Sequence, residues 1–254
     1  MSTLRARCPH CRTFTAVALG PEYQCHACGA EFAAGLVRVP RAWGSGGEAM
    51  AEAAALPLPY PEAAVVACET LEEQTTALAS SLPERPLVLG GCCCAHTGAI
   101  AGLAAGRRLA VVWLDAHGDL NTPVTSPSGN DWGMPLRAAI DGGWVAPADV
   151  ALVGARNLDP PELDYMQTVG IDDDVSRALD GADAVYIALD CDVLDPAAIA
   201  CFMPEPGGPS VADAEEILRG VAAAGVPIAG LGLTGLRPDA DVGTLARLAA
   251  AAGL

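Results

Sequence analysis

The stretch LAVVWLDAHGDLNTPVTSPSGNDW, residues 109–132, decides the fold class. It opens with an unbroken apolar run, Leu109–Leu114, which is typical of a strand buried on both faces of a sheet. Asp115, His117 and Asp119 follow at alternating positions. In extended backbone, residues two apart point to the same side, so we expect three ligand-capable side chains to gather where this strand ends.

A second apolar run, residues 184–189, ends in the same way, with Asp190 and Asp192 directly behind it. The carboxyl ends of parallel strands meet at one edge of a sheet, so four Asp and one His are expected there. Isolated charges are costly to bury, and divalent metal ions are the usual solution. The sequence therefore predicts a metal centre. Exposed loop acids are the alternative, but they do not explain why both sets follow buried strands.

The rest of the chain alternates short apolar runs with helical segments, a pattern that indicates a parallel sheet with helices on both faces. Capping signals predict three of the helices, over residues 70–82, 160–170 and 210–225. We expect a three-layer α/β/α domain over residues 35–254, with further strands at 36–39, 63–68, 87–89, 150–153 and 228–233.

Two C-x-x-C pairs stand near the N-terminus, Cys8 with Cys11 and Cys25 with Cys28. Four thiolates at this spacing fit a tetrahedral zinc ion. A module of ~30 residues has a small core and needs such a metal cross-link to fold. We predict a zinc ribbon over residues 1–34 that holds structural Zn²⁺, in preference to ordinary buried cysteines. Because it has few basic residues, packing or docking to a partner is favoured over nucleic-acid binding.

Composition narrows the classes of partner and compartment. The formal net charge of -17 argues against nucleic acid and against an anionic membrane surface. No stretch approaches the ~20 apolar residues of a membrane span, and the first residues lack the apolar core of a signal peptide. We therefore expect a cytoplasmic protein whose ten Cys are thiols or metal ligands rather than disulfides.

The motifs at the expected metal centre resemble the arginase/agmatinase (ureohydrolase) family. The resemblance covers about residues 60–240 in the same order. It implies an arginase-like fold, one or two Mn²⁺ ions, hydrolysis of a C–N bond and a homo-oligomer, a trimer or hexamer. The segments that carry it are Gly90-Gly91, Asp115-Ala116-His117-Gly118-Asp119, Asn121-Thr122-Pro123, Ser128-Gly129-Asn130, RNLDPPE at 156–162, Asp190-x-Asp192 and Asp195-Pro196.

By this resemblance, Asp115 and Asp190 bridge two Mn²⁺ ions. His117 and Asp192 complete the shell of one ion, and Asp119 serves the other. Carboxylates with one imidazole suit Mn²⁺, and two cations make hydroxide from water near neutral pH. His117 and Asp119 are therefore the expected catalytic residues.

One metal-ligand position differs from the family pattern. The family has a His where this chain has Cys93, between Cys92 and Cys94. A thiolate can bind a metal but favours softer ions than Mn²⁺, so the site nearest Asp119 is expected to be weak, empty, or filled by zinc or iron. His96, one helical turn beyond, is a conceivable substitute ligand, although an indirect or solvent-facing role is favoured.

The residues that match the family's substrate pocket predict an amino-acid head group. Asn121 and Ser128 match the residues that hold its carboxylate, and Asp159 and Glu162 match those that engage its ammonium group. Neutral donors for the carboxylate and acceptors for the ammonium suit a zwitterion. A small amino-acid-like molecule is thus the expected substrate.

The reacting end of the pocket departs from the arginases. Trp132 stands where they have a proton-shuttling His, Met203 replaces a Thr, and Gly235 replaces the Glu that binds the guanidinium. Without that carboxylate a planar cation loses a bidentate, charge-assisted pair. We therefore expect a hydrolase that acts on a modified or hydroxylated guanidino or amidino amino acid. The alternative is a catalytically inactive arginase-fold protein with a regulatory or scaffold role.

Overall fold

The computed structural model describes residues 8, 10–11, 13, 15–19, 22–33 and 35–254. Within them a seven-stranded sheet has the order β5-β4-β6-β10-β9-β7-β8, with every pairing parallel. This confirms the predicted parallel α/β architecture. The strands are β4 (Leu36–Val39), β5 (Glu62–Val65), β6 (Leu87–Gly90), β7 (Leu109–Leu114), β8 (Val150–Val153), β9 (Ala184–Asp190) and β10 (Ile228–Thr234).

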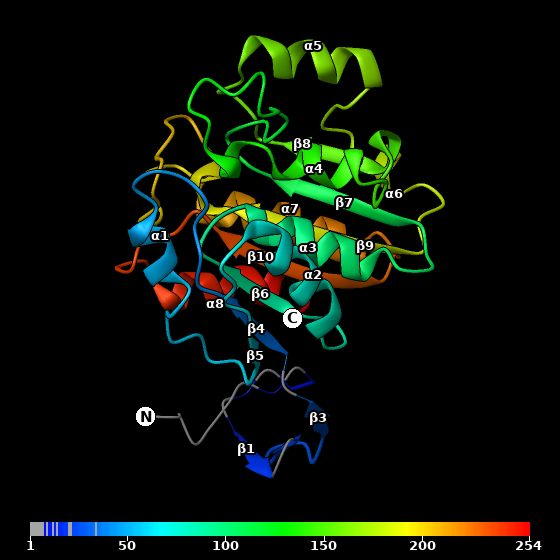
Figure 1. The fold of residues 1–254 in the computed structure, drawn as a ribbon. Coiled ribbons are helices and arrows are strands. Elements are labelled where there is room, and N and C mark those ends of the chain that lie inside the picture. Colours follow the sequence, from blue (N-terminus) through cyan, green and yellow to red (C-terminus); the bar gives the residue numbers. More distant parts are fainter. Residues whose placement is uncertain (1–7, 9, 12, 14, 20–21, 34) are drawn as a thin grey trace.

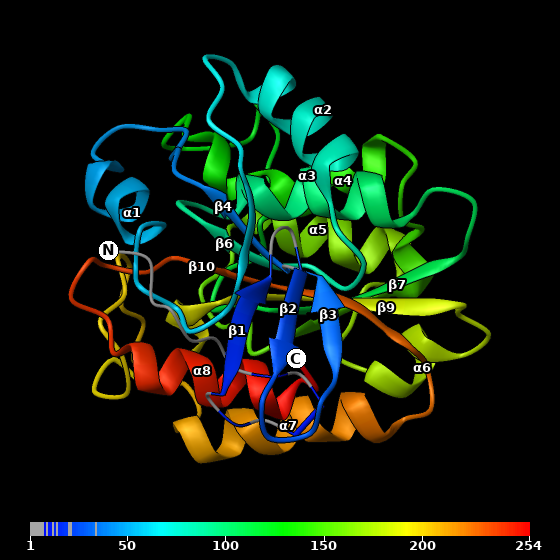
Figure 2. The ribbon, with the colours of Figure 1, turned by 90° about the horizontal axis from the view of Figure 1, so that it is seen from below.

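Helices cover both faces of the sheet (Figures 1 and 2). On one face lie α2 (Leu71–Ser81), α3 (Cys94–Leu103) and α4 (Pro135–Asp141), and on the other lie α7 (Val211–Ala223) and α8 (Val242–Ala251). The shorter or peripheral helices are α1 (Glu48–Ala53), α5 (Pro160–Val169) and α6 (Val175–Leu179). The three-layer expectation is thereby confirmed.

The predicted helix boundaries follow from capping. Helix α2 begins at a capping box of Thr70 and Glu73, and α7 begins at one of Ser210 and Asp213. Helix α5 ends at Gly170, whose φ of 78° is in the left-handed region that glycine favours. Strand β5 ends at Val65, earlier than predicted. The chain turns towards α2 after Val66, whose N–H still donates to the Arg38 carbonyl of β4 at 2.8 Å.

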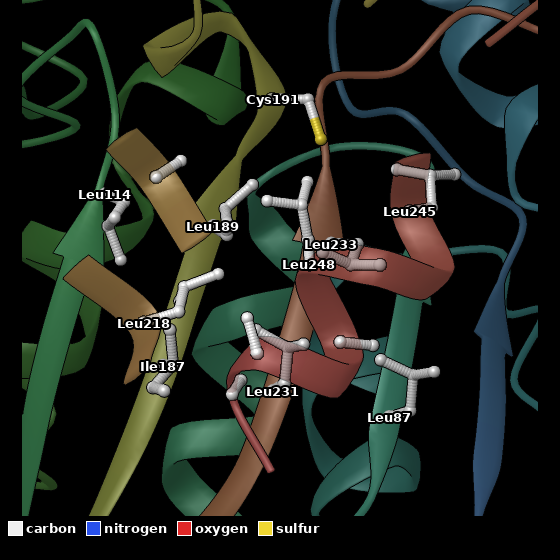
Figure 3. Close-up of a cluster of buried hydrophobic side chains, with 14 of the residues drawn as sticks. Leu87, Leu114, Ile187, Leu189, Cys191, Leu218, Leu231, Leu233, Leu245 and Leu248 are labelled. Atoms are coloured by element: carbon white, nitrogen blue, oxygen red, sulfur yellow. The ribbon is translucent and has the colours of Figure 1, made fainter. Parts of the chain in front are cut away.

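Alternation along the central strands builds a core on each side of the sheet. In β9, Ile187 and Leu189 point to the α7 and α8 side, whereas Tyr186 points to the α3 side. Figure 3 shows Ile187 and Leu189 beside Leu218 of α7. Leu248 of α8 packs against the neighbouring strand, β10. Since β9 is buried along its whole length, both faces must be apolar, which explains its unbroken run.

A small antiparallel sheet precedes the large one. It comprises β1 (Ala16–Leu19), β2 (Glu22–Cys25) and β3 (Glu31–Ala33) in the order β1-β2-β3. Figure 1 draws it beyond β5. Residues 1–7 of the expected ribbon lie outside the described residues, and the division of the chain at residues 34 and 35 stays a prediction.

The sequence predicts no membrane-spanning segment, and the helices of the structure can be compared with that prediction. In the part of the chain that the structure describes, no helix has the length and apolar character needed to span a bilayer.

Candidate metal centre and substrate pocket

The carboxyl ends of four neighbouring strands meet at one edge of the sheet. Asp115 follows β7, and Asp190 is the last residue of β9. Cys93 is the N-cap of α3, just after β6, and Thr234 ends β10. Since β10 pairs with both β6 and β9, and β9 pairs with β7, these four positions are brought together by the sheet register.

Ligand-capable atoms form two groups among the described residues. Cys93, Asp115 and Asp190 make one group, and Asp115, His117 and Asp192 make the other. Within each group, one ligand atom of every residue lies within 4.8 Å of those of the others. Asp115 belongs to both groups, as the resemblance implies for a bridging ligand, whereas Asp190 belongs only to the first.

Asp119 lies in neither of these groups of described residues, although it lines the same cavity. Its φ is 53°, an uncommon left-handed conformation for a residue other than glycine. Its carboxylate is buried, and no hydrogen-bond partner for Oδ2 is found among the described residues. A strained, unpaired acid of this kind indicates a functional rather than a structural requirement.

Hydrogen bonds hold the other carboxylates in position. Asp190 Oδ2 accepts from Cys93 Sγ at 2.7 Å and from Thr234 Oγ1 at 3.2 Å. Asp115 Oδ2 accepts from the indole of Trp113 at 3.0 Å. Asp192 Oδ2 lies 3.0 Å from Nδ1 of His117. Contacts within the protein thus orient these carboxylates without any bound cation.

The electrostatics of the protein alone oppose this concentration of carboxylates. Burial, with repulsion from Asp192, raises the pKa of Asp190 from 3.8 to about 7. Burial, with repulsion from Asp115, raises the pKa of Asp192 to about 6. Burial also raises the pKa of Asp119 well above its ordinary range. Groups of like charge that burial forces together are stabilised in the ionised form by a bound cation.

His117 is the positive partner in this cluster. Burial disfavours its charged form, but contacts with Asp115 and Asp192 outweigh that cost and raise its pKa to about 12. The residues fit a divalent metal centre, because the donors are mainly carboxylate oxygens. Asp119, whose Oδ2 has no hydrogen-bond partner in the described part of the chain, lines the same cavity. The Cys93 thiol, whose pKa is raised by burial and then by Asp190, gives one group a softer donor.

His96 is not available as a ligand in this arrangement. It is fully buried on α3, and its two ring nitrogens lie 2.9 Å from Tyr186 Oη and 3.0 Å from Thr234 Oγ1. Burial lowers its pKa to about 3, so the ring is neutral. It reaches the sheet edge that carries the two ligand groups, here called the metal edge, only through the Thr234 hydroxyl, which also bonds Asp190. Because His96 is buried, the solvent-facing alternative is wrong.

A cavity of about 250 Å³ opens above the two ligand groups. Every residue predicted for substrate binding lines it, together with residues of both ligand groups. The predicted lining residues are Asn121, Ser128, Asp159, Glu162, Trp132, Met203 and Gly235.

The head-group residues are linked to one another. Asn121 Nδ2 donates to Asp159 Oδ2 at 2.8 Å, and Asn121 Oδ1 accepts from Thr125 Oγ1 at 2.9 Å. Glu162 accepts from the backbone N–H of Leu120 and of Asp159, both at 2.9 Å. Glu162 therefore holds two loops of the pocket together, a structural task that its position in the motif did not reveal.

An apolar wall faces the reacting end of the cavity. The Trp132 and Phe202 rings meet edge to face, with centroids 5.9 Å apart, and Met50 of α1 lies in the same cluster. Cβ atoms at Gly44 and Gly47 would press on the Trp132 ring, so this glycine-rich loop is a packing surface for the ring. Cys92 and Cys94 are buried in this cluster, where they act as small packing residues.

Gly235 has a geometric reason to be glycine. Its φ is 67°, and a Cβ at this position would overlap the Asp190 carboxylate. A glutamate cannot stand here without displacing a residue of the first ligand group. The pocket therefore has no carboxylate at position 235.

The N-terminal cysteines form a separate cluster. Ligand atoms of Cys8, Cys11, Cys25 and Cys28 all lie within 4.8 Å of one another. The Sγ atoms of Cys8 and Cys28 are 3.7 Å apart, and those of Cys11 and Cys25 are 3.4 Å apart. A tetrahedron with Zn–S bonds of about 2.3 Å has edges of about 3.8 Å, so the thiols are close to the spacing that zinc requires.

The sequence of this chain matches a known protein family over most of its length. The model of the arginase family matches residues 45–253. The chain belongs to the arginase family. The arginase of Bacillus caldovelox is 37% identical over 141 residues, which cover 44% of this chain and 47% of that relative. The sequence match thus spans about half the length of the curated relatives.

Solved structures extend the similarity to the whole domain. A crystal structure of the Bacillus subtilis arginase superposes with a TM-score of 0.72 at 24% identity, covering 86% of this chain and 95% of that one. Proclavaminate amidino hydrolase from Streptomyces clavuligerus gives 0.66 at 22% identity, covering 86% and 89%. At these identities the superpositions establish the shared fold.

Proposed function

We propose that this chain is a metal-dependent hydrolase that cleaves a C–N bond in a guanidino or amidino amino acid. The observation that carries the proposal is a pair of buried ligand groups that share Asp115 and lie beneath a cavity lined by amino-acid-binding residues. Membership of the arginase family supports the reaction class. The name of one structural neighbour, an amidino hydrolase, supports the type of bond.

The metal would be one or two divalent ions, of which Mn²⁺ suits the carboxylate-rich group of Asp115, His117 and Asp192 best. The group that contains Cys93 would accept a softer ion, such as zinc or iron. When bound, such ions would supply the Lewis acidity that turns water into a nucleophile near neutral pH.

The chain's own residues then orient the substrate and move protons. Asp119 lines the cavity, and its buried Oδ2 has no hydrogen-bond partner among the described residues, so it is placed to take a proton from the attacking water and to pass it on. Asn121 and Ser128 would hold the substrate carboxylate, while Asp159 would accept from its ammonium group. Glu162 would affect ammonium binding indirectly, by holding the backbone at Leu120 and Asp159 in place.

The reacting end favours a substrate other than arginine. Gly235 supplies no negative charge, and Trp132 with Phe202 offers a flat apolar wall. A hydroxylated or N-substituted guanidine, or a neutral amidine, suits this surface better than a bare guanidinium. With no His at position 132, proton delivery to the leaving amine must come from Asp119 or water, which favours a less basic leaving group.

A panel of compounds tests the proposal. Guanidino and amidino compounds, each with and without the α-amino acid head, would be assayed for release of urea or amine by Mn²⁺-loaded protein. We expect turnover of hydroxylated or substituted guanidines to exceed that of arginine, and loss of the head group to raise KM. An Asp159→Asn variant should raise KM, whereas Asp164→Asn, an exposed position on α5, should not.

Two results would contradict the proposal in different ways. Rapid urea release from unmodified arginine would refute the argument about the reacting end. Failure of the Mn²⁺-loaded protein to turn over any member of the panel would favour the alternative, an inactive arginase-fold regulatory or scaffold protein.

We further propose that Cys8, Cys11, Cys25 and Cys28 hold a structural zinc ion. Among the described residues, few besides the cysteines form the core around the three-stranded sheet, so its order needs the metal. We also propose that the protein forms a homo-oligomer, a trimer or hexamer, which light scattering would test.

A further inference from the structure

Glu205 faces the metal edge from a loop that the sequence motifs did not single out. Its Oε1 atom lies 3.5 Å from Nε2 of His117 and accepts a hydrogen bond from Nδ2 of Asn157 at 2.8 Å. The Glu205 side chain is 24% exposed, so it stands at the border between the buried ligands and solvent.

The two nitrogens of His117 face different partners. Nδ1 lies 3.0 Å from Asp192 and 3.5 Å from Asp115, the other members of its ligand group. Nε2 is buried and has no hydrogen-bond partner among the described residues. Glu205 is the acid that lies beside this nitrogen.

Two consecutive residues hold Glu205 in place. The Arg156 guanidinium donates to the backbone carbonyl of Glu205 at 2.8 Å and to that of Asp192 at 3.0 Å. Arg156 therefore ties the Glu205 loop to the loop that carries a proposed metal ligand. Asn157 binds the Glu205 carboxylate directly, so backbone and side chain are both restrained.

We propose that Glu205 is a positioning residue for His117. By attracting a proton to Nε2, its carboxylate leaves the Nδ1 lone pair free for a divalent cation in the group with Asp115 and Asp192. Carboxylates that orient a ligating imidazole in this way strengthen metal binding, and their loss typically costs 10–100-fold in affinity. The inference rests on the proposed metal centre and adds a residue to it.

The test measures Mn²⁺ affinity, which does not depend on turnover. Calorimetric titration and electron paramagnetic resonance of free Mn²⁺ would compare the parent with Glu205→Ala and Glu205→Gln. We expect about 10–100-fold weaker binding for the alanine variant. The glutamine variant should recover part of this loss, because its amide oxygen can still accept. Glu216→Ala, which removes an exposed acid from α7, should bind as the parent does.

A double-mutant cycle separates positioning from general damage to the fold. Asn157→Ala should also weaken Mn²⁺ binding, and it should add little to Glu205→Ala because both changes disable the same contact. Melting temperatures of the metal-free variants should stay near that of the parent. Should the alanine variant fold poorly, the glutamine variant and Asn157→Ala still decide the question.

The outcomes are distinguishable. Parent-like affinity in Glu205→Ala, or fully additive losses in the cycle, would overturn the positioning role while leaving the metal centre intact. Failure of the parent itself to bind Mn²⁺ in its core would overturn the proposed metal centre, and this inference with it.

Discussion

Replacing Asp190 by asparagine should stabilise the metal-free protein while weakening its metal binding. Asp190 is 3% exposed and stands beside other acids. Its pKa rises from 3.8 to about 7 on folding, so folding opposes its ionisation. At about 1.4 kcal/mol for each pKa unit, the ionised group costs up to about 4 kcal/mol above pH 7.

The sign of the pH dependence follows from proton binding. Below pH 3.8 the carboxyl is protonated in both states, so it costs nothing. Between pH 3.8 and about 7 the folded protein retains the proton that the unfolded chain has lost, so stability falls as pH rises. Asparagine has no charge and escapes this loss. The advantage of Asp190→Asn should therefore be largest above pH 7 and less than half as large at pH 5.

The hydrogen bonds around residue 190 can accommodate an asparagine in place of the aspartate. The amide oxygen can still accept from the backbone N–H of Asp192, and the amide NH₂ can donate to Cys93 or Thr234 in place of accepting from them. With some loss from imperfect geometry, we expect a net gain of about 1–3 kcal/mol at pH 8. For a domain of this size that is a rise of about 3–9 °C in Tm.

The assay is thermal unfolding at pH 5 and pH 8, with and without Mn²⁺. Without metal, Asp190→Asn should melt above the parent at pH 8. With saturating Mn²⁺ the parent should gain more than the variant, because the variant lacks an anionic oxygen at the metal edge. Asp164→Asn controls for removal of an exposed charge. A metal-free variant less stable than the parent at pH 8, or an equal gain from Mn²⁺, would refute the reasoning.

Further predictions concern zinc, a glycine and pH. Cys25→Ser should lower bound zinc by one equivalent per chain, and an unchanged zinc content would contradict the ribbon. Gly235→Ala should lower Tm, because its Cβ would overlap Asp190, whereas Gly220→Ala on α7 meets nothing within 4 Å and should raise stability by about 0.5–1 kcal/mol. Equal effects of the two alanines would contradict the packing at Gly235. Mn²⁺ affinity should rise from pH 5 to pH 8, because protons compete for Asp190 and Asp192, whose pKa values are about 7 and 6. Affinity independent of pH over this range would contradict that competition.

The parallel sheet was predictable because its central strands are buried on both faces. Unbroken runs such as Leu109–Leu114 are typical of strands buried on both faces, and the acids that follow such parallel strands then share one edge. Capping residues such as Thr70 and Ser210 gave helix starts for a local reason, since their side chains bond the first turn.

The rest of the site depends on contacts between distant loops, which carry no periodic signal. Met50 of α1 and Phe202 of a later loop reach the reacting end from distant parts of the chain, and nothing in their spacing links them to Trp132. Glu205 is placed by the guanidinium of Arg156, a long-range restraint. Asp119 has a left-handed backbone that no spacing rule foretold, although the glycine before it was a hint of a tight turn.

Metal analysis of the purified chain tests the central claim most directly. Elemental analysis after dialysis with Mn²⁺ would compare the parent with Asp115→Asn, which removes the residue that both core ligand groups share. We expect one zinc per chain in each protein, at the four N-terminal cysteines, and one or two further divalent ions in the parent alone. Core metal that is equally abundant in Asp115→Asn would contradict the account.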